Sequence, residues 1–175
     1  MYVSLYRLTK AGRLLDAYGG GRLTLSAGYV TPKQAKMWEL RKNGMGESRI
    51  ARELEVTRQT VHKAVNVAND GIYRALMETA EISRIRVKTV DPAKGILLGY
   101  SPEFDSSVIV TFSVRNGVQV WYKHEGDCKK CDQLEKCRRT ILTEMEDRNI
   151  PPPECAGSNL PSELAKRLFD KILEK

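Results

Sequence analysis

Residues 46–65 carry two short apolar patterns of helical period, separated by only a few residues. Two helices joined so closely must cross tightly, and Ala51 supplies the small residue that such a crossing needs. The other apolar positions would face each other across the two helices. They would close a small core made of Ile50, Leu54, Val56, Val61 and Val65. The segment therefore predicts a compact helix pair with a tight turn.

Capping signals predict where the helices of this region begin and end. Thr31-Pro32 is typical of a helix start, and Gly44 is expected to stop that first helix. The second helix is expected from residues 46–47. Thr57 is expected to cap a longer third helix, whose apolar face continues through Leu76. Residues 69–71, Asn-Asp-Gly, are a weak point at which we expect this helix to kink or break.

From residue 84 onwards the apolar period changes to two, which is typical of strands. Strands are expected at 85–89, 94–100, 107–114 and 118–123. Asn116-Gly117, between the last two, accepts positive φ at both turn positions and predicts a hairpin. We therefore expect a small antiparallel sheet of about four strands.

The two ends of the chain carry weaker signals. Apolar residues from Tyr2 to Leu15 are compatible with a short helix, and residues 22–26 with a short strand. Helices are also expected up to about Arg148 and from Pro161, with a stiff proline connector between them. The expected fold class is α+β. Its parts are an N-terminal segment (1–30), a helix-turn-helix domain (31–83), and a domain with the sheet, the cysteine segment and C-terminal helices (84–175).

The charge balance favours an anionic partner. The chain has 29 Lys and Arg residues against 22 Asp and Glu residues, a formal net charge of +7, and most of the excess falls in residues 1–82. No stretch approaches the roughly 20 apolar residues of a membrane span. The first residues lack the basic start and apolar run of a signal peptide. We therefore expect no membrane association and a cytoplasmic location.

The stretch from Val30 to Ala64 resembles a known DNA-binding motif. Its Thr-Pro-Lys-Gln start, glycine break and Ile50-Ala-Arg-Glu-Leu-Glu-Val-Thr-Arg-Gln-Thr-Val segment resemble the helix-turn-helix of sigma-factor region four. The stretch is also similar to LuxR-type and archaeal Tfx-type domains. It departs from them at Glu55, where these families place glycine, but a non-glycine residue adopts that conformation at modest cost. The resemblance implies that the helix starting at Thr57 binds double-stranded DNA.

Residues at the start of such a helix face base edges and phosphates. Arginine pairs bidentately with guanine and glutamine with adenine, so Arg58 and Gln59 are candidates for sequence recognition. A helix pair used only for packing or protein contact is the alternative. The candidate DNA contacts are Arg58, Gln59, Thr60, His62 and Lys63, and the candidate phosphate contacts are Lys33, Lys36, Arg41, Lys42, Arg49 and Arg52.

The four cysteines are spaced C-x2-C-x5-C-x17-C. Such clustering in a cytosolic protein favours metal binding over a disulfide framework. The first three resemble the 4Fe–4S segments of endonuclease III-type glycosylases and WhiB-type regulators, in which a fourth cysteine lies elsewhere. On that resemblance a 4Fe–4S cluster would be held by Cys128, Cys131, Cys137 and Cys155. Zinc, His124 as a replacement ligand, and unligated or disulfide-bonded cysteines stay open.

Together these features predict a DNA-binding transcription regulator whose cysteine site senses redox state or iron, or is purely structural. A homodimer is expected because single helix-turn-helix units bind weakly. There are two candidate dimer surfaces, the apolar face of residues 61–76 and the helix from Pro161. For residues 61–76, packing in the core of the same chain is an equally favoured interpretation.

Two other functions are less favoured. No P-loop, G-x-S-x-G or paired acidic nuclease motif is present, so we do not expect an enzyme, although a nucleic-acid-processing enzyme with a structural cluster is an alternative. The sheet could instead bind a metabolite. Its pocket would be lined by Gly99, Tyr100, Phe104, Trp121 and Tyr122.

Overall fold

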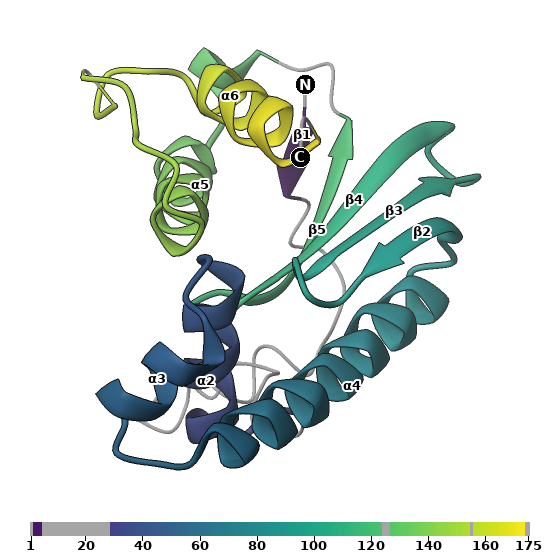
Figure 1. Cartoon of the computed structure of the whole chain (residues 1–175). Coiled ribbons are helices and arrows are strands. Elements are labelled where there is room, and N and C mark those ends of the chain that lie inside the picture. The colour runs from purple at the N-terminus through teal and green to yellow at the C-terminus, as the bar shows by residue number, and fades with distance from the viewer. Residues whose placement is uncertain (1, 5–28, 124–126, 155, 174–175) are drawn as a thin grey trace, which may run out of the picture.

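The computed structural model describes residues 2–4, 29–123, 127–154 and 156–173. Its elements form three layers (Figure 1), with a central antiparallel sheet between α2 and α4 on one face and α5 and α6 on the other. Helices and strands occupy separate stretches of the chain, as predicted for an α+β fold. The helices are α2 (Pro32–Lys42), α3 (Glu47–Glu53), α4 (Arg58–Ile82), α5 (Leu134–Asp147) and α6 (Pro161–Leu173), with a 3-10 turn η2 (Cys128–Lys130). The strands are β1 (Tyr2–Ser4), β2 (Arg86–Asp91), β3 (Ile96–Ser101), β4 (Ser106–Ser113) and β5 (Gly117–Lys123).

The first and third helices of residues 31–83 begin at side-chain caps. The Thr31 hydroxyl accepts from the Gln34 N–H (3.4 Å) and the Gln34 side chain accepts from the Thr31 N–H (2.9 Å), which is a capping box. Gly44 follows α2 with φ +90° and allows the chain to leave the helix. The Thr57 hydroxyl accepts from the Thr60 N–H (3.1 Å) at the start of α4. These predicted boundaries are confirmed.

The predicted kink at residues 69–71 is wrong, because α4 is continuous over 25 residues. Gly71 instead allows another segment of the chain to approach the helix closely. A Cβ at this position would lie 2.1 Å from the Tyr29 carbonyl oxygen and 3.3 Å from a methyl group of Val30. The chain that precedes α2 therefore crosses directly over α4. This tertiary contact outweighs the low helix propensity of glycine.

The sheet has five strands in the order β1-β5-β4-β3-β2, and every neighbouring pair is antiparallel. The four predicted strands are present, and β1 adds a fifth at the edge of β5, with Tyr2 opposite Lys123. A helix that includes Tyr2 is therefore wrong, because the edge of β5 supplies hydrogen-bond partners to residues 2–4. The rest of that helix, and the strand predicted at 22–26, lie outside the described residues.

Two strands depart from their predicted patterns for local reasons. A bulge between Val87 and Thr89 interrupts the alternation of β2, and Val87 is exposed. β3 begins at Ile96 rather than at residue 94 because Gly95 occupies a turn with φ +64°. A Cβ on Gly95 would also lie 2.7 Å from the Phe112 carbonyl oxygen, so the turn packs closely on β4.

The predicted hairpin at Asn116-Gly117 joins β4 to β5 with a different geometry. Ser113 pairs with Gly117, which leaves a loop of residues 114–116, and of the dipeptide only Gly117 has positive φ (+66°). The Asn116 side chain instead donates to the Thr140 carbonyl oxygen and to the Glu144 carboxylate, each at 3.3 Å. These bonds tie the hairpin to α5.

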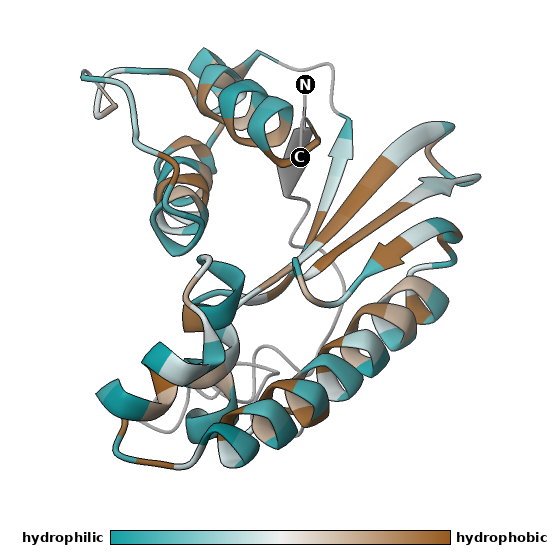
Figure 2. Cartoon of the chain, in the orientation of Figure 1, coloured by the Kyte–Doolittle hydropathy of each residue, from teal (hydrophilic) through white to brown (hydrophobic). Residues whose placement is uncertain are grey.

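The two faces of the sheet carry separate apolar cores. Figure 2 shows the apolar side of α4 turned toward the sheet and its polar side toward solvent. Ala68, Ile72 and Leu76 pack there with sheet residues such as Val110. Of the two interpretations of residues 61–76, core packing is therefore the correct one. The predicted dimer surface on α6 is likewise wrong, because its apolar side is buried in the second core. That core contains Ile96, Ile109, Trp121, Cys137, Ile141, Met145, Leu164, Ala165, Leu168, Phe169 and Ile172.

Candidate functional site

A third, smaller core holds α3 against α2 and the first turns of α4. Ile50 and Val61 are fully buried in it, and Ala51 lies at the crossing. The turn of residues 54–57 is closed by the Val56 N–H, which donates to the Ala51 carbonyl oxygen (2.9 Å). Glu55 adopts the expected left-handed conformation there, with φ +53°. This core places the start of α4 at the end of the molecule remote from α6 (Figure 1).

The predicted DNA contacts of α4 lie together at this end. Arg58, Gln59, His62 and Lys63 are exposed around the buried residues of the same turns. Thr60 is also exposed, but its hydroxyl lies 2.8 Å from the Thr57 hydroxyl and already belongs to the helix cap. Four side chains are therefore presented to solvent from the first two turns of α4.

An acidic side chain of α3, which the sequence did not single out, orients two of these groups. Glu47 accepts from Arg58 Nε (3.4 Å), and its second carboxylate oxygen lies 3.0 Å from His62 Nδ1. His62 Nε2 lies 3.1 Å from the Asn66 amide nitrogen. Since the carboxylate can only accept, His62 Nδ1 donates in this bond. The hydrogen bond with His62, assisted by Arg58, lowers the pKa of Glu47, so the carboxylate is ionised at neutral pH.

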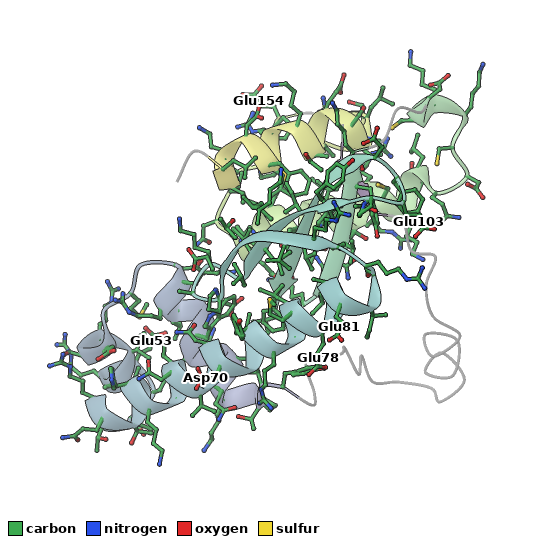
Figure 3. All side chains as sticks on the ribbon, turned by 90° about the vertical axis from the view of Figure 1, so that its right-hand side faces the viewer. Glu53, Asp70, Glu78, Glu81, Glu103 and Glu154 are labelled. Carbon is green, nitrogen blue, oxygen red and sulfur yellow. The ribbon has the colours of Figure 1, made fainter. Side chains whose placement is uncertain are left out.

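The predicted phosphate contacts are distributed more widely over the bundle. Lys33 and Arg49 are exposed, and so is Lys36, which lies 4.0 Å from Glu39. Arg41 and Arg52 are exposed as well. Figure 3 shows nitrogen-tipped side chains around this end of the molecule, with the acidic side chains of Glu53 and Asp70 among them.

Lys42 is not a surface phosphate contact, and this prediction is wrong. Its Nζ donates to the Asp147 carbonyl oxygen (2.8 Å) and lies 4.9 Å from the ring centroid of Trp38. The side chain is therefore held between the end of α2 and the end of α5. An amphipathic pattern could not distinguish it from its exposed neighbour Arg41, because its hydrogen-bond partner Asp147 is 105 residues away.

The three described cysteines lie on adjoining elements. Cys128 is the first residue of η2, Cys131 follows η2 directly, and Cys137 lies near the start of α5. Cys131 is exposed, whereas Cys137 is only 9% exposed within the second core. Across the described ranges, no three side chains of metal-ligating type come together. Cys155 and His124 lie outside those ranges, so the four-cysteine site stays a prediction.

The residues proposed to line a metabolite pocket do not form one. Trp121 is buried toward α5 and α6, whereas Tyr122 is buried toward α4. Phe104 packs edge-on against Tyr122, with ring centroids 5.0 Å apart. Adjacent strand residues point to opposite faces of a sheet, so this set is divided between two cores.

A buried ionic cluster joins α5 to the sheet and was not predicted. Arg148 Nε lies 2.9 Å from the Glu144 carboxylate, and both side chains are buried. The terminal nitrogens of Arg148 donate to the carbonyl oxygens of Lys94 (2.9 Å), Gly95 (3.3 Å) and Phe112 (3.3 Å). Glu144 and Arg148 are four residues apart, like an ordinary solvated pair on a helix, so the sequence carries no signal of their burial.

Comparisons with family models, with curated proteins and with solved structures give no match to this chain. Within the part of the chain that the structure describes, no helix has the length and apolar character needed to cross a membrane.

Proposed function

We propose that this protein is a sequence-specific DNA-binding transcription regulator in which the start of α4 enters the major groove. The observation that carries the proposal is the α3–α4 pair, which has its own core and holds a capped helix start away from the sheet. Arg58 and Gln59 offer the donors that match guanine and adenine edges. The N–H groups of the first helical turn add an electrostatic preference for phosphate. These features favour DNA over a purely structural use of the helix pair.

The test is binding to a duplex selected from a random library, followed by fluorescence anisotropy. Arg58→Ala or Gln59→Ala should lose about 1–3 kcal/mol of binding free energy and relax base choice at one position. Lys36→Ala should weaken binding to all duplexes alike. Affinity should also fall steeply with salt because phosphate contacts release counterions. Wild-type affinity for the selected duplex in both α4 variants would show that α4 is not the recognition helix.

A four-cysteine metal site is the second part of the proposal. Its support is the placement of Cys128, Cys131 and Cys137 around η2 and the start of α5, with Lys129 and Lys130 beside them. Basic neighbours favour thiolates, which are the metal-binding form. With Cys155 these residues would hold a 4Fe–4S cluster, and zinc is the alternative. A bound cluster would supply sensitivity to redox state or iron supply. Anaerobic purification with an absorbance spectrum and analysis of iron, sulfide and zinc distinguishes the two metals.

We keep a homodimer as part of the proposal because a two-fold dimer matches palindromic DNA and strengthens weak single contacts. The apolar sides of α4 and α6 are excluded as its interface, since both are buried within the chain. Sedimentation is the measurement. A species of 19.8 kDa without DNA, together with one chain per duplex in the complex, would contradict the dimer.

A further inference from the structure

Four basic side chains from distant parts of the chain line one hollow. They come from the end of α2, the turn before β3, the residue after α5 and the last turn of α6. The volume of the hollow is about 140 Å³, and none of the described residues that line it is acidic. Its lining consists of Lys42, Lys94, Arg148, Lys171, Asn43, Ile96, Ile150 and Ile172.

Lys42 carries a largely buried positive charge at this hollow. Burial, with the nearby positive charge of Arg148, lowers the pKa of Lys42 to about 8. The carboxylates of Glu144, Asp147 and Glu39 act in the opposite direction. Glu144 is already paired with Arg148, as Asp147 is with a second arginine. Because the lining brings four cationic side chains together and includes no acidic one among the described residues, an anion placed in the hollow would be attracted.

The two innermost cations differ in the donors that they offer. The guanidinium of Arg148 is used by Glu144 and three backbone carbonyl groups, so it contributes charge rather than new hydrogen bonds. Lys42 has three ammonium donors, and one is used by the Asp147 carbonyl oxygen. Lys42 therefore supplies the directional contact to an anion.

We propose that this hollow, the α2–α6 basic pocket, binds a small organic oxyanion. The phosphate or carboxylate group would meet Lys42 and Lys171, and a short apolar body would lie against Ile96, Ile150 and Ile172. A cavity of this size is comparable with one that holds benzene, so we infer a body of about six heavy atoms. Anion binding by this pocket does not depend on the proposed DNA-binding function.

A regulatory consequence rests on the proposed DNA-binding function. The anion would compete with the Asp147 carbonyl oxygen for Lys42 Nζ, which joins the end of α2 to the end of α5. α2 also packs against α3 and α4 in the small core. Occupancy of the pocket would therefore change how firmly the DNA-binding bundle is attached to the rest of the molecule.

The experiment is calorimetric titration of the full chain with phenyl phosphate, benzoate and inorganic phosphate, and with benzyl alcohol as the neutral probe. Saturable binding of phenyl phosphate or benzoate, and none of benzyl alcohol, is expected; the tighter of the two identifies the oxyanion. Lys171→Glu should weaken binding by about tenfold or more because it reverses a charge at the pocket. Lys166→Glu is the matched control on the same helix; Lys166 pairs with Asp170 and does not line the pocket, so less than about a twofold change is expected.

A second variant and a pH series distinguish a specific loss of anion binding from misfolding of the variant. Lys42→Met should also lose binding while retaining cooperative thermal unfolding, and wild-type affinity should fall above about pH 8 as Lys42 loses its proton. The proposal of anion binding at this pocket would be contradicted if the Lys171→Glu and Lys166→Glu variants bound the anion with equal affinity. It would also be contradicted if benzyl alcohol bound as tightly as phenyl phosphate and benzoate.

The regulatory step has its own measurement. Phenyl phosphate should change the affinity for a selected duplex, and Lys171→Glu should abolish that change. Unchanged DNA affinity with intact ligand binding would overturn the regulation alone. If no duplex is bound at all, the proposed function fails while the pocket stands on the calorimetry.

Discussion

Glu47 links α3 to two basic side chains of the neighbouring helix, and its removal should separate affinity from specificity. Glu47→Ala frees Arg58 and His62 and removes a negative charge from the proposed DNA-binding surface. We expect several-fold tighter binding to any duplex but a smaller ratio between selected and unrelated sequences. Anisotropy with both duplexes measures the two quantities. Glu53→Ala, which removes an exposed acid of the same helix, is the control and should leave the ratio unchanged.

Lys42 should make the free energy of unfolding depend on pH. Its pKa is about 8 in the folded chain and about 10.5 when unfolded, so between these values the unfolded state binds more protons. The contribution of Lys42 to stability therefore rises with pH in this window, by at most about 1.4 kcal/mol per pH unit. Urea unfolding of wild type and Lys42→Met from pH 7 to pH 10 measures the difference. If the free energies of unfolding of wild type and Lys42→Met changed in parallel with pH, the pKa of Lys42 would not be lowered in the folded chain.

At the scale of elements, Gly71 tests whether packing or propensity governs α4. Propensity alone predicts that Gly71→Ala stabilises a helix interior by about 1 kcal/mol. The new Cβ would instead stand 2.1 Å from the Tyr29 carbonyl oxygen, so we expect a loss of about 1–3 kcal/mol. Gly157→Ala has no atom within 4 Å of its Cβ and should change stability by less than about 0.5 kcal/mol. Chemical denaturation of both variants gives the sign of each change in the free energy of unfolding.

The η2 segment offers a clean test of metal binding because Cys131 is exposed, whereas Cys137 is part of a core. Cys131→Ser should lower metal content and thermal stability together in anaerobically purified protein, since metal binding contributes folding energy. After chelation, wild type and variant should unfold at the same temperature. Full metal occupancy in Cys131→Ser would remove this residue from the ligand set. Cys137→Ser is less informative, because it places a hydroxyl in an apolar core whatever the metal does.

For the whole molecule, the two tryptophans report on opposite faces of the sheet. Trp38 packs against Phe112 on the α4 side, and Trp121 packs against Phe169 on the α6 side, each with ring centroids 5.4 Å apart. Both cores use the same strands, so loss of one core leaves the sheet exposed. We therefore expect the single-tryptophan variants Trp38→Phe and Trp121→Phe, each compared with circular dichroism of the same protein, to show one coincident transition. A tryptophan transition separate from that of the backbone would show that residues 31–83 unfold as their own domain.

Much of the secondary structure could be predicted because its causes are local. Thr31, Thr57 and Gly44 act on residues within one turn, and the periods of the apolar residues follow from the helix and strand geometries. The core of the helix pair was predictable for the same reason, since Ile50 and Val61 are close in sequence. The DNA-contact candidates of α4 followed from their position relative to Thr57.

The sequence by itself thus determined where the helices of residues 31–83 begin and the α+β class, because these depend on neighbours a few residues away. Only the tertiary structure decided the continuity of α4 through Gly71, the buried position of Lys42, and the covering of the apolar sides of α4 and α6. Each depends on a partner that is distant in sequence, such as Tyr29 for Gly71 and Asp147 for Lys42. A periodic pattern shows that a face is apolar, but the packing of the whole chain decides what covers it.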